Sequence, residues 1–330
     1  MSWRAFPKVE LHLHLEGAAP PGFIRGLAKE KHIDVSGIFN ADGSYKFRDF
    51  GHFLQVYEAA TSVLTSLRDF GRLTEAVLEE LAAHNVVYAE TFLSPDFCGG
   101  GDLAAWRDYL GEIEDAAKRA EMAHGIVLKG IITNIRHFGP DAARPIAICA
   151  AETAGDFIRG YGMGGDEMVG TQGDYAWAFD CAREAGLRLT THAGEWGGAE
   201  SIRQALDDLK VERIGHGVQA WHDPALVERL ARDGVTLETC PGSNIALGLY
   251  RHWHDHPIER LREAGVAVTV STDDPPFFHT DMTREFNMLG KTFGWNEEDF
   301  SALNTEALDA AFCDSETKDK IRKQLEPSHE

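Results

Sequence analysis

The stretch VELHLHLEGA, residues 9–18, places four titratable side chains at alternate positions: Glu10, His12, His14 and Glu16. A valine and three leucines fill the positions between them. Because successive side chains of a β-strand point to opposite faces, the titratable residues share one face and the apolar residues share the other. The apolar face is suited to packing beneath helices, so we expect the titratable face to point into the interior of a barrel.

Seven further segments are rich in β-forming and apolar residues, and the eight together lie at residues 7–14, 85–94, 126–135, 157–165, 187–194, 211–217, 235–243 and 266–274. Segments with helical apolar spacing separate most of them, for example residues 103–122, 173–186, 199–209 and 223–234. Alternating strands and helices favour parallel βαβ units. Eight units predict an α/β fold, a (β/α)8 TIM barrel in a single domain over residues 1–330, with extra helices at about 281–325. A doubly wound open sheet is the alternative.

The composition limits the partners and the kind of site. The 330 residues include 53 acidic against 32 basic side chains, a formal net charge of -21, which disfavours binding to nucleic acids or anionic membranes. The sequence starts without a signal-peptide pattern and has no apolar run long enough to span a bilayer, so we expect a cytoplasmic protein. The five cysteines form no CxxC pair. Any metal site should therefore use histidine and carboxylate ligands.

Polar side chains gather where the later predicted strands end. They are Asp166 and Glu167, His192 and Glu195, His216, Ser243 and Asn244, and Asp273 and Asp274. In a TIM barrel the active site lies at the C-terminal ends of the strands. The two histidines of the first strand, together with His192 and Asp273, make a donor set of three nitrogens and one oxygen. This set suits zinc with a further position open for water.

Two other patterns have simpler interpretations. The sequence HWHDH at 252–256 resembles a metal motif, but it lies in a hydrophilic segment and is interpreted as a solvated loop. Cys240 lies near a strand end without a histidine of its own and is interpreted as a buried structural thiol. Glu10 lies deeper in the first strand, where it could orient a histidine ligand or pair with a basic side chain.

Six motifs together resemble the adenosine deaminase family of zinc-dependent purine aminohydrolases. They are PKVELHLHLEGA (7–18), GGDE (164–167), THAGE (191–195), RIGHG (213–217), CPGSN (240–244) and STDDPPFF (271–278), and the resemblance covers about residues 7–290. Other zinc deaminases carry an HxE and PCxxC pair that is absent here. The resemblance implies one zinc ion per chain held by His12, His14, His192 and Asp273.

The resemblance also implies catalytic roles. His216 and Asp274 would orient the water that attacks C6 of the purine, and a protonated Glu195 would donate a proton to N1. A carboxyl group that stays protonated needs a raised pKa, which burial can supply. The backbone amide of Gly165 would lie near the purine N3, with Asp166 supporting that loop.

The resemblance implies a small purine as the substrate, and the motifs point in two directions about which purine it is. In nucleoside-specific members the acid at Glu16 is expected to meet the ribose hydroxyls, and RIGHG and STDDPPFF favour the nucleoside branch. In contrast, Phe92 stands where nucleoside deaminases often have arginine, which favours the free-base branch, and Ser94 of the same segment is a further candidate contact. We expect conversion of adenosine to inosine and ammonia, with adenine or a modified adenine nucleoside as the alternative. The sequence does not predict the oligomeric state.

Two rival classes make different predictions. Two-metal amidohydrolases and phosphoesterases of similar fold generally bridge their ions with a modified lysine at the end of the fourth strand, where this chain has GGDE. A non-enzymatic purine-binding protein should lack a metal ligand or the acid, whereas all seven predicted metal and catalytic positions are occupied here.

Overall fold

The computed structural model describes residues 3–326, so residues 1–2 and 327–330 of the predicted domain lie outside the described residues. Eight parallel strands pair in sequence order. They are β1 (Lys8–His14), β2 (Val86–Leu93), β3 (Val127–Ile135), β4 (Ile158–Gly164), β5 (Arg188–Ala193), β6 (Arg213–His216), β7 (Thr236–Thr239) and β8 (Val268–Val270).

The sheet closes on itself just beyond β8. Leu13 forms a parallel bridge with Asp273, the amide of His14 donates to the carbonyl of Asp273 at 3.0 Å, and the amide of Asp273 donates to the carbonyl of His12 at 3.1 Å. The predicted (β/α)8 barrel is therefore confirmed, and the open doubly wound sheet is wrong.

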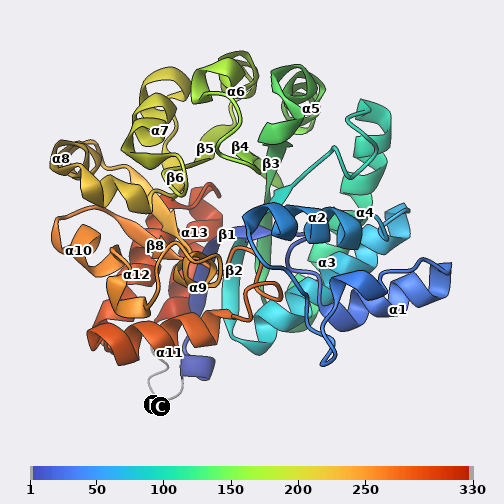
Figure 1. Ribbon diagram of the computed structural model, residues 1–330, viewed down its shortest axis with the longest axis horizontal. Helices are drawn as coiled ribbons and strands as arrows, with labels where there is room; N and C mark the ends of the chain where they lie inside the picture. Colours follow the sequence, from blue (N-terminus) through green and yellow to red (C-terminus); the bar gives the residue numbers. More distant parts are fainter. Residues whose placement is uncertain (1–2, 327–330) are drawn as a thin grey trace.

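The helices surround this barrel (Figure 1). They are α1 (Pro21–Lys31), α2 (Phe50–Thr61), α3 (Leu67–Ala83), α4 (Leu103–His124), α5 (Pro140–Thr153), α6 (Ala176–Glu184), α7 (Gly198–Gln204), α8 (Pro224–Asp233), α9 (Pro241–Ala246), α10 (Ile258–Glu263), α11 (Met282–Phe293), α12 (Glu297–Ala310) and α13 (Ser315–Leu325). The last three are the extra C-terminal helices expected at 281–325. None of the helices within residues 3–326 combines the length and the hydropathy needed to cross a lipid bilayer. The cytoplasmic location stays a prediction.

The last two strands are shorter than predicted. β7 ends at Thr239 and β8 at Val270, whereas the predicted segments continue to residues 243 and 274. After β7, Pro241 occupies the first turn of α9, where its fixed φ suits a helix. After β8, Asp273 adopts a left-handed backbone with φ 67°, which turns the chain at the barrel rim.

Strand β1 shows the predicted division of faces. Val9 and Leu11 point outward and pack with Leu308 of α12 and Ile321 of α13. The side chains of Glu10 and His12 point inward and are fully buried. The apolar face thus anchors the strand beneath the C-terminal helices, while the polar face is held inside the barrel.

The deep end of the barrel holds a buried cation. Arg213 of β6 is 1% exposed, lies over the ring of Phe312 with its Cζ 3.6 Å from the ring centroid, and pairs with Glu90 at 2.7 Å and Glu238 at 2.6 Å. A buried charge is tolerated when paired and hydrogen-bonded. Arg213 therefore places a positive charge beside the two buried acidic side chains inside the barrel.

Candidate active site

Three imidazoles and one carboxylate converge at the C-terminal end of the barrel. The Nε2 of His192 lies 3.0 Å from Nε2 of His12 and 3.2 Å from Nε2 of His14, and Oδ1 of Asp273 lies 3.4 and 3.3 Å from the same two atoms. Ligand atoms about 2.05 Å from a tetrahedral zinc ion lie about 3.3 Å apart. The spacing and chemistry of the donor set therefore fit zinc.

Neighbouring groups set which nitrogen of each histidine is free to bind metal. Nδ1 of His192 donates to the carbonyl of Met163 at 2.8 Å, and Nδ1 of His12 donates to the Glu238 carboxylate at 2.7 Å. In both rings Nε2 is the nitrogen that faces the centre of the cluster, where it can bind a metal. The hydroxyl of Ser243 donates to Oδ2 of Asp273 at 2.7 Å and holds the fourth donor.

Glu238 was not among the residues predicted from sequence. It lies on β7, fully buried, and also accepts from the Thr190 hydroxyl at 2.8 Å and from Nε of Arg213 at 2.6 Å. Burial raises its pKa, but Arg213 and His12 outweigh burial and lower the pKa of Glu238 to about 2. A permanently charged acceptor thus faces His12. In the sequence, Glu238 is a single carboxylate within a predicted strand, TLET, and no local pattern there marks it as a partner of His12.

Glu10 takes neither role that the sequence left open. Its carboxylate accepts from the backbone amide of Thr272 at 2.8 Å and from the hydroxyl of the same residue. Burial raises the pKa of Glu10 to about 7. Glu10 thereby connects β1 to the segment after β8 that carries Asp273.

Glu195 is a buried carboxyl group beside the donor set. Oε1 accepts from Nδ2 of Asn244 at 3.2 Å and lies 3.8 Å from Nδ1 of His216. Burial raises the pKa of Glu195 well above its usual range, and the charges of Asp273 and Glu167 add to this. The environment thus favours the protonated form that a proton donor requires.

His216 and Asp274 lie on the other sides of the same space. Nε2 of His216 is 3.9 Å from Oδ2 of Asp273, and burial lowers the pKa of His216 to about 3, which favours the neutral ring. Burial, followed by the charges of Asp273 and Glu195, raises the pKa of Asp274 well above its usual range. Oδ1 of Asp274 is buried without a hydrogen-bond partner and lies against Gly17, where a Cβ atom would be 1.5 Å from it.

Glu167 holds the loop that carries Glu195. Its carboxylate accepts hydrogen bonds from four successive backbone amides, those of Gly194 (2.5 Å), Glu195 (3.0 Å), Trp196 (2.6 Å) and Gly197 (3.0 Å). Hydrogen bonds to a charged acceptor are stronger than neutral ones. The GGDE and THAGE motifs are therefore parts of one structure.

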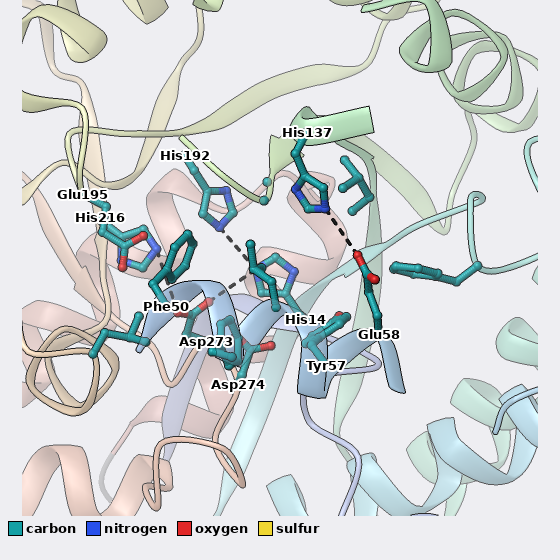
Figure 2. Close-up of a pocket in the computed structure, with 17 residues that line it drawn as sticks. His14, Phe50, Tyr57, Glu58, His137, His192, Glu195, His216, Asp273 and Asp274 are labelled. Atoms are coloured by element: carbon teal, nitrogen blue, oxygen red, sulfur yellow. Dashed lines mark hydrogen bonds and ion pairs between the residues drawn. The ribbon is translucent and has the colours of Figure 1, made fainter. Parts of the chain in front are cut away.

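The donor set opens into a pocket with an aromatic wall (Figure 2). Helix α2 contributes Phe50, Phe53 and Tyr57, and Phe97 follows β2. The cavity volume is about 70 Å³, small beside the roughly 300–1,000 Å³ of pockets for drug-sized ligands. A small, flat and largely apolar ligand suits such a cavity.

The predicted substrate-binding residues occupy different places. Gly165 lines the pocket with a left-handed φ of 99°. Phe92 packs behind the donor set, its ring centroid 4.7 Å from that of His12 and 4.8 Å from that of His14. Ser94 is buried outside the pocket lining, and Asp166 accepts from the backbone amide of Met168 at 2.9 Å within its own turn. Their contacts with a substrate stay predictions.

Glu16 is also buried outside the pocket lining. The hydroxyl of Tyr57 donates to its Oε2 at 3.4 Å, and Tyr57, not Glu16, lines the pocket. Burial raises the pKa of Glu16 to about 7. The acid that the resemblance assigned to ribose recognition is thus covered by a tyrosine side chain.

The HWHDH segment is only partly solvated. The side chain of His254 is 69% exposed, as expected, but His256 is buried, so the interpretation as a solvated loop is wrong for this residue. Nδ1 of His256 accepts from the amide of Ile258 at 3.3 Å, so its Nε2 donates to Oδ1 of Asn244 at 3.1 Å. This fixes the Asn244 amide with its NH2 group toward Glu195. Cys240 is buried, as its interpretation as a structural thiol requires.

Comparison with known proteins agrees with this geometry. A family model described as adenosine deaminase matches residues 7–327. The chain is 45% identical over 319 residues to an adenine deaminase of Rhizobium leguminosarum bv. trifolii, covering 96% of this chain and 98% of the relative. Two crystal structures are similar over nearly the whole chain. One is an adenine deaminase from Arthrobacter aurescens (TM-score 0.88, 30% identity, 97% and 99% of the two chains), and the other is an amidohydrolase from Burkholderia ambifaria with bound Zn (TM-score 0.87, 28% identity, 98% and 90%).

Proposed function

Since the chain belongs to the adenosine deaminase family and is an aminohydrolase acting on C–N bonds, we propose that it converts adenine to hypoxanthine and ammonia. This replaces adenosine, which we expected from sequence, by the alternative. Relatives that are 39–45% identical and match over nearly the full length carry the name adenine deaminase. We further propose one zinc ion per chain, held by His12, His14, His192 and Asp273.

The position of Glu16 carries the choice of the free base. A nucleoside enzyme of this family would be expected to present this acid to the ribose hydroxyls. Here its carboxylate faces the Tyr57 hydroxyl at 3.4 Å and lies outside the pocket lining. The small cavity and the aromatic side chains of α2 also favour a planar base without a sugar.

The reaction requires a nucleophile at C6 and a proton at N1. Zinc, when bound, acts as a Lewis acid that lowers the pKa of water and so makes a hydroxide nucleophile available near neutral pH. We propose that His216, whose ring is neutral, and Asp274, which also lines the pocket, orient the attacking water, and that His216 accepts its proton. Glu195, protonated through burial, donates its proton to N1, which neutralises the charge that develops on the ring.

The test is product identification with zinc-loaded protein. Adenine should yield hypoxanthine and ammonia in equal amounts, and one zinc ion should be bound per active chain. Two tightly bound metals per chain would favour the two-metal amidohydrolase alternative. Absence of ammonia release from adenine would contradict the proposed activity.

A further inference from the structure

A second pair of polar side chains lines the same pocket, on the side opposite the proton donor. Figure 2 shows Glu195 and His216 on one side of the donor set, with Glu58 and His137 on the other. Glu58 belongs to α2 and His137 lies in the 3-10 turn Arg136–Phe138 after β3. Oε1 of Glu58 is 3.5 Å from Nε2 of His137, and the Glu58 side chain is 51% exposed.

The turn after β4 fixes which nitrogen of His137 faces Glu58. The backbone amide of Asp166 donates to Nδ1 of His137 at 3.2 Å, so this nitrogen is unprotonated and Nε2 carries the hydrogen that faces Glu58. A Cβ atom at Gly165 would lie only 2.7 Å from Nδ1 of His137, so the imidazole is packed directly against the glycine that lines the pocket. His137 thus ties the Glu58 carboxylate to the Gly165 turn and leaves a second carboxylate oxygen free.

The purine ring itself determines what reaches this end of the pocket. With C6 at the donor set and N1 at Glu195, the opposite end of the bicyclic ring carries N9. In the free base N9 can carry a hydrogen, whereas in a nucleoside it carries the sugar. Among the described residues lining the pocket, the carboxylates are Glu58, Glu195, Asp273 and Asp274, and all except Glu58 belong to the metal and catalytic groups.

We propose that Glu58, oriented by His137, accepts a hydrogen bond from N9–H and selects a free 6-aminopurine base over N9-substituted purines. This inference rests on the proposed function for the placement of the ring. A substituent on N9 removes the donor and pushes a carbon against the carboxylate, so the penalty combines a lost charge-assisted hydrogen bond with desolvation of Glu58. Specificity of this kind comes from a group left unpaired by the wrong substrate.

The matched substrates are adenine and 9-methyladenine, which differ only at N9. The unaltered enzyme should prefer adenine in kcat/KM. In Glu58→Ala this preference should fall roughly 10- to 100-fold through a loss on adenine, while 9-methyladenine changes by less than about 3-fold. Glu75→Ala is the control, because Glu75 is a similarly exposed helix residue paired with Arg119 at 2.6 Å outside the pocket lining. The Glu75→Ala variant should prefer adenine over 9-methyladenine as strongly as the unaltered enzyme does. Equal losses on both substrates in Glu58→Ala, or no loss on either, would overturn the inference.

Equilibrium binding separates this inference from the proposed function. Calorimetry with Glu195→Gln protein, in which turnover is slowed, should show tighter binding of adenine than of 9-methyladenine, and adding Glu58→Ala should remove the difference. Failure of adenine turnover in the unaltered protein would contradict the proposed function alone. Equal binding of the two purines when Glu58 is intact would overturn the inference alone.

Discussion

Replacing Glu238 by glutamine tests how the zinc ligands are held. The carboxylate of Glu238 accepts from Nδ1 of His12 at 2.7 Å and from Nε of Arg213 at 2.6 Å, both inside the barrel. A glutamine has one acceptor oxygen for these two donors, and its NH2 group must face the other one. His12 then loses either its orientation or the charged partner that increases its strength as a ligand.

The expected loss of zinc affinity is about 10- to 100-fold, the usual effect of removing the hydrogen-bond partner of a metal ligand, which corresponds to about 1.4–2.7 kcal/mol. The assay is competition for zinc with a chromophoric chelator at fixed pH. Glu90→Gln is the matched control, because Glu90 is also buried and pairs with Arg213 at 2.7 Å, yet does not touch His12. Both variants should unfold more easily, but only Glu238→Gln should release zinc more readily. Equal zinc affinities in the two variants would refute the reasoning.

Two further substitutions have distinct readouts. Glu195→Gln should keep its zinc content while adenine turnover falls about 10²- to 10⁴-fold, because the amide cannot supply the proton; undiminished turnover would exclude Glu195 as the donor. Burial raises the pKa of Glu285 from 4.5 to about 8, so the stability that its protonated form provides is complete below pH 4.5 and is lost as the pH rises toward 8. In urea unfolding, Glu285→Gln should therefore match the unaltered protein near pH 5 and exceed it near pH 8.5 by at most about 5 kcal/mol; a variant that gains no stability between these pH values would contradict this.

The barrel could be predicted because strand-like segments alternate with helical ones, and because apolar and titratable side chains alternate along the first strand. In β1, alternation of leucine with Glu10, His12 and His14 sets both the strand and its inward face, and the structure preserves that division. The four donor residues were also predictable, since the C-terminal ends of parallel barrel strands meet at one rim. The spacing between β1 and Asp273 follows from closure of the barrel, where the two segments pair directly.

The rest of the pocket depends on contacts that no local pattern encodes. Tyr57 and Glu58 lie on α2, in the long segment that connects β1 to β2. Only the tertiary structure of that segment brings α2 over the donor set. Glu238 becomes recognisable only when its neighbours across the barrel are known. His256 shows the same limit. Its segment is hydrophilic in sequence, yet its imidazole points inward and is hydrogen-bonded to Asn244.

The most direct test of the proposed activity is the ratio of kcat/KM for adenine to that for adenosine, measured with zinc-loaded protein at neutral pH. Because Glu16 is covered by Tyr57 and Glu58 faces the N9 end of the ring, we predict a ratio well above 100, with hypoxanthine as the product. Preferential conversion of adenosine to inosine would contradict the account.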